Sequence, residues 1–194
     1  MLHKIWLSAF CMTLLFNGCS ESENGEGNEN STAQAQGWHQ QGRDCLACHN
    51  EDLNPDKHLL FGGTLYKDQY ITDQNNLSSM CGGDLIVNFL DENGVVQYSS
   101  KDFIANGSKG YKAKGNIFIM QRQLRLLGAG IYYIQITDAN ANQLAGPARH
   151  TFSSADYNTN NPTDPNNELS CNACHNVGGI QYPLYVEENG NLCR

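Results

Sequence analysis

Two copies of one short motif carry most of the chemistry that this sequence can express. Residues 45–49 read CLACH and residues 171–175 read CNACH. C-x-x-C-H is the attachment signature of c-type haem, in which two thioethers hold the porphyrin and the histidine ligates its iron. The sequence therefore predicts two covalent c-type haems, and the residues expected to hold them are Cys45, Cys48, His49, Cys171, Cys174 and His175.

A shared zinc site is the main alternative use of these cysteines, because two C-x-x-C pairs supply four thiolates. Compact zinc ribbons separate their pairs by roughly 15–20 residues, whereas 122 residues lie between Cys48 and Cys171. A thioredoxin-like redox pair requires a β-α-β pattern, and neither motif has one nearby. The spacing and the two histidines therefore favour haem.

Each iron takes a second axial ligand, and three histidines are candidates for it. We favour His39 and His150, with His58 close behind. Two of the three would make both haems bis-histidine, which closes the iron to external ligands and gives a lower potential than Met/His ligation. Met80 and Met120 are weaker candidates, because methionine in such runs more often fills the core. The sequence does not pair these candidates with particular haems.

The amino terminus indicates export. Residues 1–18 combine Lys4, a short apolar run and small residues, which is the pattern of a signal peptide, and the run is shorter than the ~20 residues of a membrane span. FNGC resembles the lipobox of bacterial lipoproteins, so Cys19 is expected to be acylated, with plain secretion as the alternative. Residues 19–37 are rich in Ser, Glu, Asn and Gly, and are predicted to form a disordered tether.

Two further cysteines lie outside the motifs and the export segment. Cys81 and Cys193 could form a disulfide in an oxidising exported compartment. Two separate thiols are the alternative, because the sequence cannot place their Cα atoms within bonding range.

Between the motifs the sequence has the periodicity of strands. Turn signals follow two of the strand-like runs, DENGV at 91–95 and DANANQ at 138–143. One short helical turn is expected within 121–128. The runs themselves are rich in Ile, Val, Tyr and Phe, and cover residues 59–66, 84–91, 95–100, 116–120 and 130–138.

Short strands at regular spacing predict a mainly β fold, with an antiparallel β-sandwich over residues 59–150. Irregular haem-binding segments are expected on both sides of it, at 38–58 and, together with a linker, at 151–194. Because the ends of a domain commonly lie close together, we expect both segments to meet on one side of the sandwich. The apolar neighbours expected for the haems are Trp38, Leu46, Leu53, Tyr182 and Leu184.

The middle of the chain resembles the carboxypeptidase-regulatory or transthyretin-like sandwich, in the stretches GGTLY, DLIVNFLDENGVV, GNIFI and GAGIYYIQITDANANQ. The flanks HQQGRDCLACH and CNACHNVGG are similar to those of extracellular c-type cytochrome lipoproteins of bacteria that respire on external acceptors. This resemblance implies an electron carrier without a substrate pocket. Its partners would be redox proteins or extracellular electron acceptors, with self-assembly into a haem chain as an option.

Two other functions are possible for a chain with these motifs. A dihaem peroxidase with one open haem is the main enzyme alternative, and the supply of distal histidines and the short chain argue against it. A β-sandwich binding module that carries haem within a larger assembly is the other. The net charge of −8 argues against nucleic acid or anionic lipid as partners, so a lipid anchor is the expected membrane contact. The location expected is the outer membrane or cell surface, with a soluble periplasmic or secreted form as the alternative.

Two further features carry less weight. Arg43, Lys57 and Arg149 could pair with haem propionates, although exposed cations need no such explanation. Residues 156–168 have the composition of a calcium loop, but Asn161 and Asn167 stand where such a loop needs Gly and Glu, so the segment is interpreted as a linker.

Overall fold

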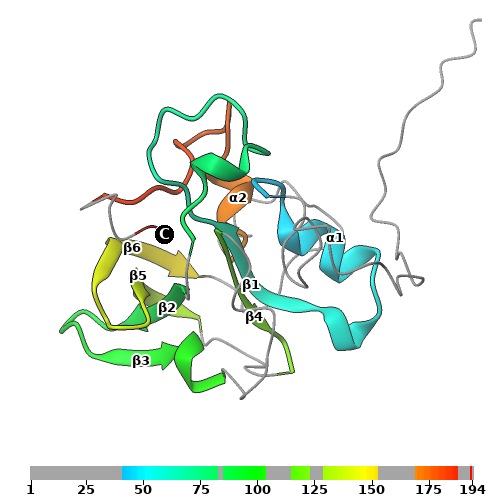
Figure 1. Ribbon diagram of the computed structural model, residues 1–194. Helices are drawn as coiled ribbons and strands as arrows, with labels where there is room; N and C mark the ends of the chain where they lie inside the picture. The colour runs from blue at the N-terminus through cyan, green and yellow to red at the C-terminus, as the bar shows by residue number, and fades with distance from the viewer. Residues whose placement is uncertain are drawn as a thin grey trace, which may run out of the picture.

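The structure is a computed structural model (Figure 1), and it describes residues 41–82, 85–103, 115–122, 129–152, 169–187 and 193. The expected signal peptide, Cys19, the tether, Trp38 and His39 lie outside the described residues. So do the linker at 156–168 and all but the first two residues of the expected helical turn at 121–128. Among the residues that are described, no helix has the length and apolar character needed to cross a membrane.

The described chain is mainly β, with antiparallel sheets and few helices. One sheet pairs β1 (Leu59–Thr64) with β4 (Asn116–Met120), and the other has the strand order β3-β2-β5-β6. The remaining strands are β2 (Leu85–Leu90), β3 (Val96–Ser99), β5 (Gly130–Asp138) and β6 (Gln143–Phe152). The helices are α1 (Cys45–Glu51) and α2 (Cys171–Cys174), and the 3-10 turns are η1 (Pro55–Lys57), η2 (Leu77–Ser79) and η3 (Ser100–Phe103).

Five of the strands lie within the five runs that the sequence marked, which confirms those predictions. The sixth, β6, was not among them, although it is one of the strands nearest the second motif. Its residues do not alternate clearly and it contains Pro147, which cannot donate a ladder hydrogen bond. β6 tolerates Pro147 because it is the last strand of its sheet and pairs with β5 alone.

Aspartates form the two hairpin turns that the sequence predicted. Asp91 Oδ1 accepts hydrogen bonds from the backbone N–H groups of Asn93 and Val95, both at 2.9 Å, in the turn between β2 and β3. Asp138 Oδ1 accepts from Asn140 and Asn142, at 2.9 and 2.8 Å, in the turn between β5 and β6. Each turn thus fixes the register of a hairpin in the four-stranded sheet.

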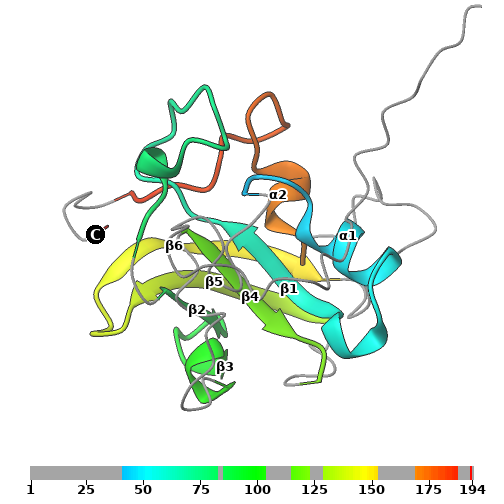
Figure 2. The ribbon, with the colours of Figure 1, turned by 45° about the vertical axis from the view of Figure 1, so that its right-hand side comes forward.

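The two sheets share one apolar core. Figure 2 shows β1 and β4 lying across the four-stranded sheet. Phe61 of β1 meets Phe89 of β2 edge to face, with ring centroids 5.3 Å apart, and Phe89 also lies 6.3 Å from Phe152 of β6. These three rings are nearly fully buried and connect the sheets. β1 is therefore a rigid base for anything that packs on it.

A disulfide joins Cys81 to Cys193, with an S–S distance of 2.04 Å across a sequence separation of 112. Both residues are buried in the core cluster. The bond ties the end of the chain to the loop that follows η2.

Removal of this disulfide is expected to destabilise the fold. The Cys81→Ala/Cys193→Ala variant should lose roughly 2–5 kcal/mol of unfolding free energy, because the closed loop is long and its closure restricts the unfolded chain. Urea denaturation of the variant and the wild type measures the difference. Equal midpoints and equal slopes would contradict the expectation.

Candidate functional site

The first motif opens a helix. α1 begins at Cys45 because Asp44 caps it, and Asp44 Oδ1 accepts hydrogen bonds from the N–H groups of Leu46 and Ala47, both at 3.1 Å. Leu46 is fully buried in the core and anchors the helix. The expectation of an irregular segment was therefore wrong here, and Asp44 directly before the motif was the signal that could have corrected it.

The second motif is also helical. α2 covers Cys171–Cys174, and the N–H of His175 donates to the carbonyl of Cys171 at 2.7 Å. Its first spacer, Asn172, is 1% exposed. Ser170 precedes α2 as Asp44 precedes α1, but its side chain does not cap its helix as that of Asp44 does.

The two motif helices are in direct contact although their first cysteines are 126 positions apart in the sequence. The hydroxyl of Ser170 donates to Asp44 Oδ1, so the residues that start the helices are hydrogen-bonded to each other. Asn172 Nδ2 donates to the carbonyl of Arg43 at 2.7 Å. Both flanking segments thus meet on one side of the fold, at β1, as the sequence predicted (Figure 1).

Two consecutive glycines of β1 make room for the motif helices. A Cβ at Gly62 would lie 3.0 Å from Cys45 Cβ, and one at Gly63 would lie 2.7 Å from Cys171 Cβ. Successive residues of a strand face opposite sides of its sheet. Cys45 and Cys171 therefore lie against opposite faces of β1. The glycine pair was visible in the sequence, because glycine within a strand often marks a close approach of another backbone.

Alanine at either glycine is expected to disturb one motif selectively. Gly63→Ala should displace Cys171 and lower haem attachment at the second motif, and Gly62→Ala should do the same at Cys45. Each change should cost about 1–3 kcal/mol of stability through overpacking. Digestion and mass spectrometry of the haem peptides reads the two motifs separately, so each variant is the control for the other. Wild-type stability with equal haem at both motifs in both variants would count against this packing.

The motif histidines are held in the same way. His49 Nδ1 lies 2.8 Å from the carbonyl oxygen of Lys57, and His175 Nδ1 lies 2.9 Å from that of Tyr182. A carbonyl only accepts, so Nδ1 carries the proton in each ring and Nε2 carries the lone pair of the neutral imidazole. This hydrogen bond orients a metal-ligating histidine and fixes its tautomer. Both rings are therefore prepared to ligate through Nε2.

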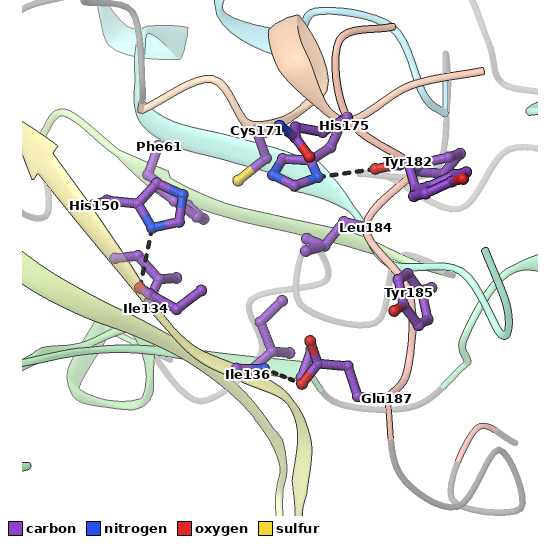
Figure 3. Close-up of a pocket in the computed structure, with 15 residues that line it drawn as sticks. Phe61, Ile134, Ile136, His150, Cys171, His175, Tyr182, Leu184, Tyr185 and Glu187 are labelled. Atoms are coloured by element: carbon purple, nitrogen blue, oxygen red, sulfur yellow. Dashed lines mark hydrogen bonds between the residues drawn. The ribbon is translucent and has the colours of Figure 1, made fainter. Parts of the chain in front are cut away.

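A cavity of about 220 Å³ lies beside the second motif (Figure 3). His175 and His150 both line it, His175 from just beyond α2 and His150 from β6. Desolvation lowers the pKa of His175, opposed by its bond to Tyr182 and reinforced by the nearby His150. The rest of the wall is mainly apolar and includes Phe61, Ile134, Ile136, Ala145, Pro183 and Leu184, together with Cys171.

The cavity thus brings together residues that the sequence marked separately: Cys171, His175, His150, Tyr182 and Leu184. Arg149 lies between Ala148 and His150 along β6, is exposed, and is not part of the wall.

The other candidate ligands lie elsewhere. His58 is close to the first motif, and its Nε2 lies 3.1 Å from the carbonyl oxygen of Leu53. Met80 is fully buried and bridges to Tyr66, and Met120 of β4 packs against the core. Both methionines therefore have structural roles.

The motif cysteines do not resemble a reactive redox pair. Burial, with Asp44 nearby, raises the pKa of Cys45 to about 12, and burial also raises the pKa of Cys171. Reactive C-x-x-C pairs instead have lowered thiol pKa values. Cys45, Cys171 and Cys174 carry free thiols, whereas Cys48 is disulfide-bonded. A thioether at Cys48 would require reduction of that bond first.

Metal-ligating side chains do not cluster in the part of the chain that the structure describes. Within those ranges, no three His, Cys, Asp or Glu side chains gather as a metal ion held by protein groups alone would require.

Comparison with known proteins identifies neither a family nor a function for this chain. No protein-family model, curated protein or solved structure matches the chain. The function is therefore argued from the chain's own residues.

Proposed function

We propose that the protein is a dihaem c-type cytochrome that carries electrons and has no catalytic role of its own. The observation that supports this most is that the histidines of its two C-x-x-C-H motifs are held by the same kind of hydrogen bond. In each, Nδ1 of the motif histidine is bonded to a backbone carbonyl seven or eight residues further along, which leaves Nε2 as the ligating atom. His150 Nδ1 also lies 3.1 Å from a backbone carbonyl, but from that of Ala148, two residues earlier in the chain.

Each motif would hold one haem, and haem iron supplies one-electron oxidation and reduction. The cysteines would fix the porphyrin through thioethers, which are uncharged and therefore suited to half-buried positions such as that of Cys171. His49 and His175 would provide the proximal nitrogen with its direction already set. The first haem would be held by Cys45, Cys48 and His49, and the second by Cys171, Cys174 and His175.

His150 is the distal ligand that the geometry favours for the second haem, because it lines the same apolar cavity as His175. The mainly apolar wall around the two rings would lower the local dielectric constant at a bound haem. The cavity is smaller than the ~300–1,000 Å³ of most ligand pockets, so it would enclose part of a porphyrin and leave an edge at the surface. An exposed edge suits exchange of electrons with a partner.

His39 and His58 are the candidates for the distal ligand of the first haem. His58 lies close to that motif. Its Nε2 would have to break its contact with the Leu53 carbonyl oxygen before it could bind iron. With a histidine on both sides, each iron is closed to external ligands, and the potential is lower than with Met/His ligation.

The wider setting follows from the same proposal. The two sheets around one core would act as a small β-sandwich, with the haem segments carried on β1. Export and acylation at Cys19 would place this unit at the outer membrane or cell surface. There it would pass electrons to redox proteins, to extracellular acceptors, or along a chain of its own copies.

Visible spectra of the reduced protein, with and without carbon monoxide, test the carrier against the peroxidase. A bis-histidine carrier should show six-coordinate haem spectra that carbon monoxide leaves unchanged over minutes. Rapid binding of carbon monoxide to either ferrous iron would contradict this closure and favour an enzyme with an open haem.

A further inference from the structure

Asn172 occupies the first spacer of the second motif, where the first motif has Leu46. Both side chains are buried, with exposures of 1% and 0%. Leu46 belongs to the apolar core, whereas a buried amide needs hydrogen-bond partners. The haem signature fixes the cysteines and the histidine and leaves the spacers free. Haem attachment therefore does not explain an asparagine at this depth.

The partners of Asn172 lie on three different parts of the site. Its Nδ2 donates to the carbonyl of Arg43 at 2.7 Å, just before the first motif, and to Thr64 Oγ1 at 3.2 Å. Its Oδ1 accepts from the N–H of Thr64, the last residue of β1, at 3.0 Å. The same Nδ2 lies 3.8 Å from Cys45 Sγ, within reach of a weak N–H···S bond.

These contacts join the two motifs to each other and to the end of β1. Cys45 and Cys171 lie against opposite faces of β1, at Gly62 and Gly63. A single side chain of the second motif contacts the start of α1, the end of β1 and the sulfur of the first motif's leading cysteine. Its amide is satisfied on both the donor and the acceptor side, and such a buried network is rigid.

We propose that Asn172 is the positioning residue that couples the two haem sites. The inference rests on the proposed function and adds a specific role within it. Asn172 fixes the second motif relative to the first, so the two haems are held at a set spacing and angle. The second motif would also act directly on the first, because the Asn172 N–H reaches the sulfur that would form a thioether to the first haem. Electrons would then pass between the haems within one molecule.

Asn172→Leu tests this role without changing the attachment signature, because it converts CNACH into CLACH, the spelling of the first motif. Circular dichroism in the Soret band reports on the haem pair, since two interacting haems give paired bands of opposite sign that depend on spacing and angle. We expect the variant to retain two covalent haems and to lose this couplet. The variant with Cys171 and Cys174 both replaced by alanine supplies the single-haem baseline.

A couplet of wild-type size in a two-haem Asn172→Leu protein would overturn the inference, as would a two-haem wild type without a couplet. If Asn172→Leu loses the second haem, Thr64→Val decides instead. That variant keeps the motif intact and removes the hydroxyl partner of Asn172, so its couplet should weaken, and an unchanged couplet would count against the inference. A wild type without covalent haem would overturn the proposed function itself.

Discussion

Replacement of Cys171 and Cys174 by alanine is expected to remove one of the two covalent haems and leave the other in place. The reason is that, under the proposed function, each motif would supply both thioethers of its own haem, and no cysteine of the other motif would replace them. The Cys45→Ala/Cys48→Ala variant should give the same loss at the first motif. The haem-to-protein ratio, measured on denatured protein from a host that matures c-type cytochromes, gives the count.

The matched control is the Cys81→Ala/Cys193→Ala variant, because it removes two cysteines that belong to a structural disulfide. It should retain both haems while losing stability. If replacing the cysteines of either motif leaves the haem content unchanged, covalent attachment at that motif is wrong.

Replacement of His150 is expected to open one iron. His150→Ala should allow carbon monoxide to bind one of the two ferrous haems. Among the described residues, His150 and His175 are the two histidines that line the cavity of the second motif, so loss of His150 leaves no described histidine to act as the distal ligand. His150→Met should instead keep that haem six-coordinate and raise its potential by roughly 0.1 V or more, since axial ligands set haem potentials over about 0.8 V. Carbon monoxide difference spectra and a redox titration measure the two effects.

Arg149→Ala is the control for His150, because Arg149 is the preceding residue on β6, is exposed and lies outside the cavity wall. It should change neither ligand binding nor potential. An His150→Ala protein that stays closed to carbon monoxide, with both potentials unchanged, would show that His150 is not a distal ligand.

Much of the fold could be predicted, because strands and turns follow from local patterns. The alternation in residues 116–120 and 130–138 matches β4 and β5 to the residue, and the Asp91 turn follows from side-chain bonds to nearby backbone. β6 could not be found in this way. Pro147 lies in the middle of β6, and proline at such a position usually indicates the end of a strand. The proline is tolerated because β6 is at the edge of its sheet.

The residues of the candidate site could be named from the sequence, whereas their arrangement in space could not. The motif residues are named by spacing alone, but the match of His150 to the second motif depends on β6 lying next to the segment that follows α2. The role of Asn172 was hidden for a different reason. A spacer in C-x-x-C-H carries no signal of its own, and its partners Arg43 and Thr64 are more than a hundred residues away in the sequence.

The most direct test of the account is the intact mass of the wild-type chain under denaturing conditions, after expression in a host that matures c-type cytochromes. Denaturation releases haem that is held by iron ligation alone and leaves thioether-bound haem attached. A dihaem c-type cytochrome should have a mass equal to the processed chain plus two haems. A chain that carries no haem mass would contradict it.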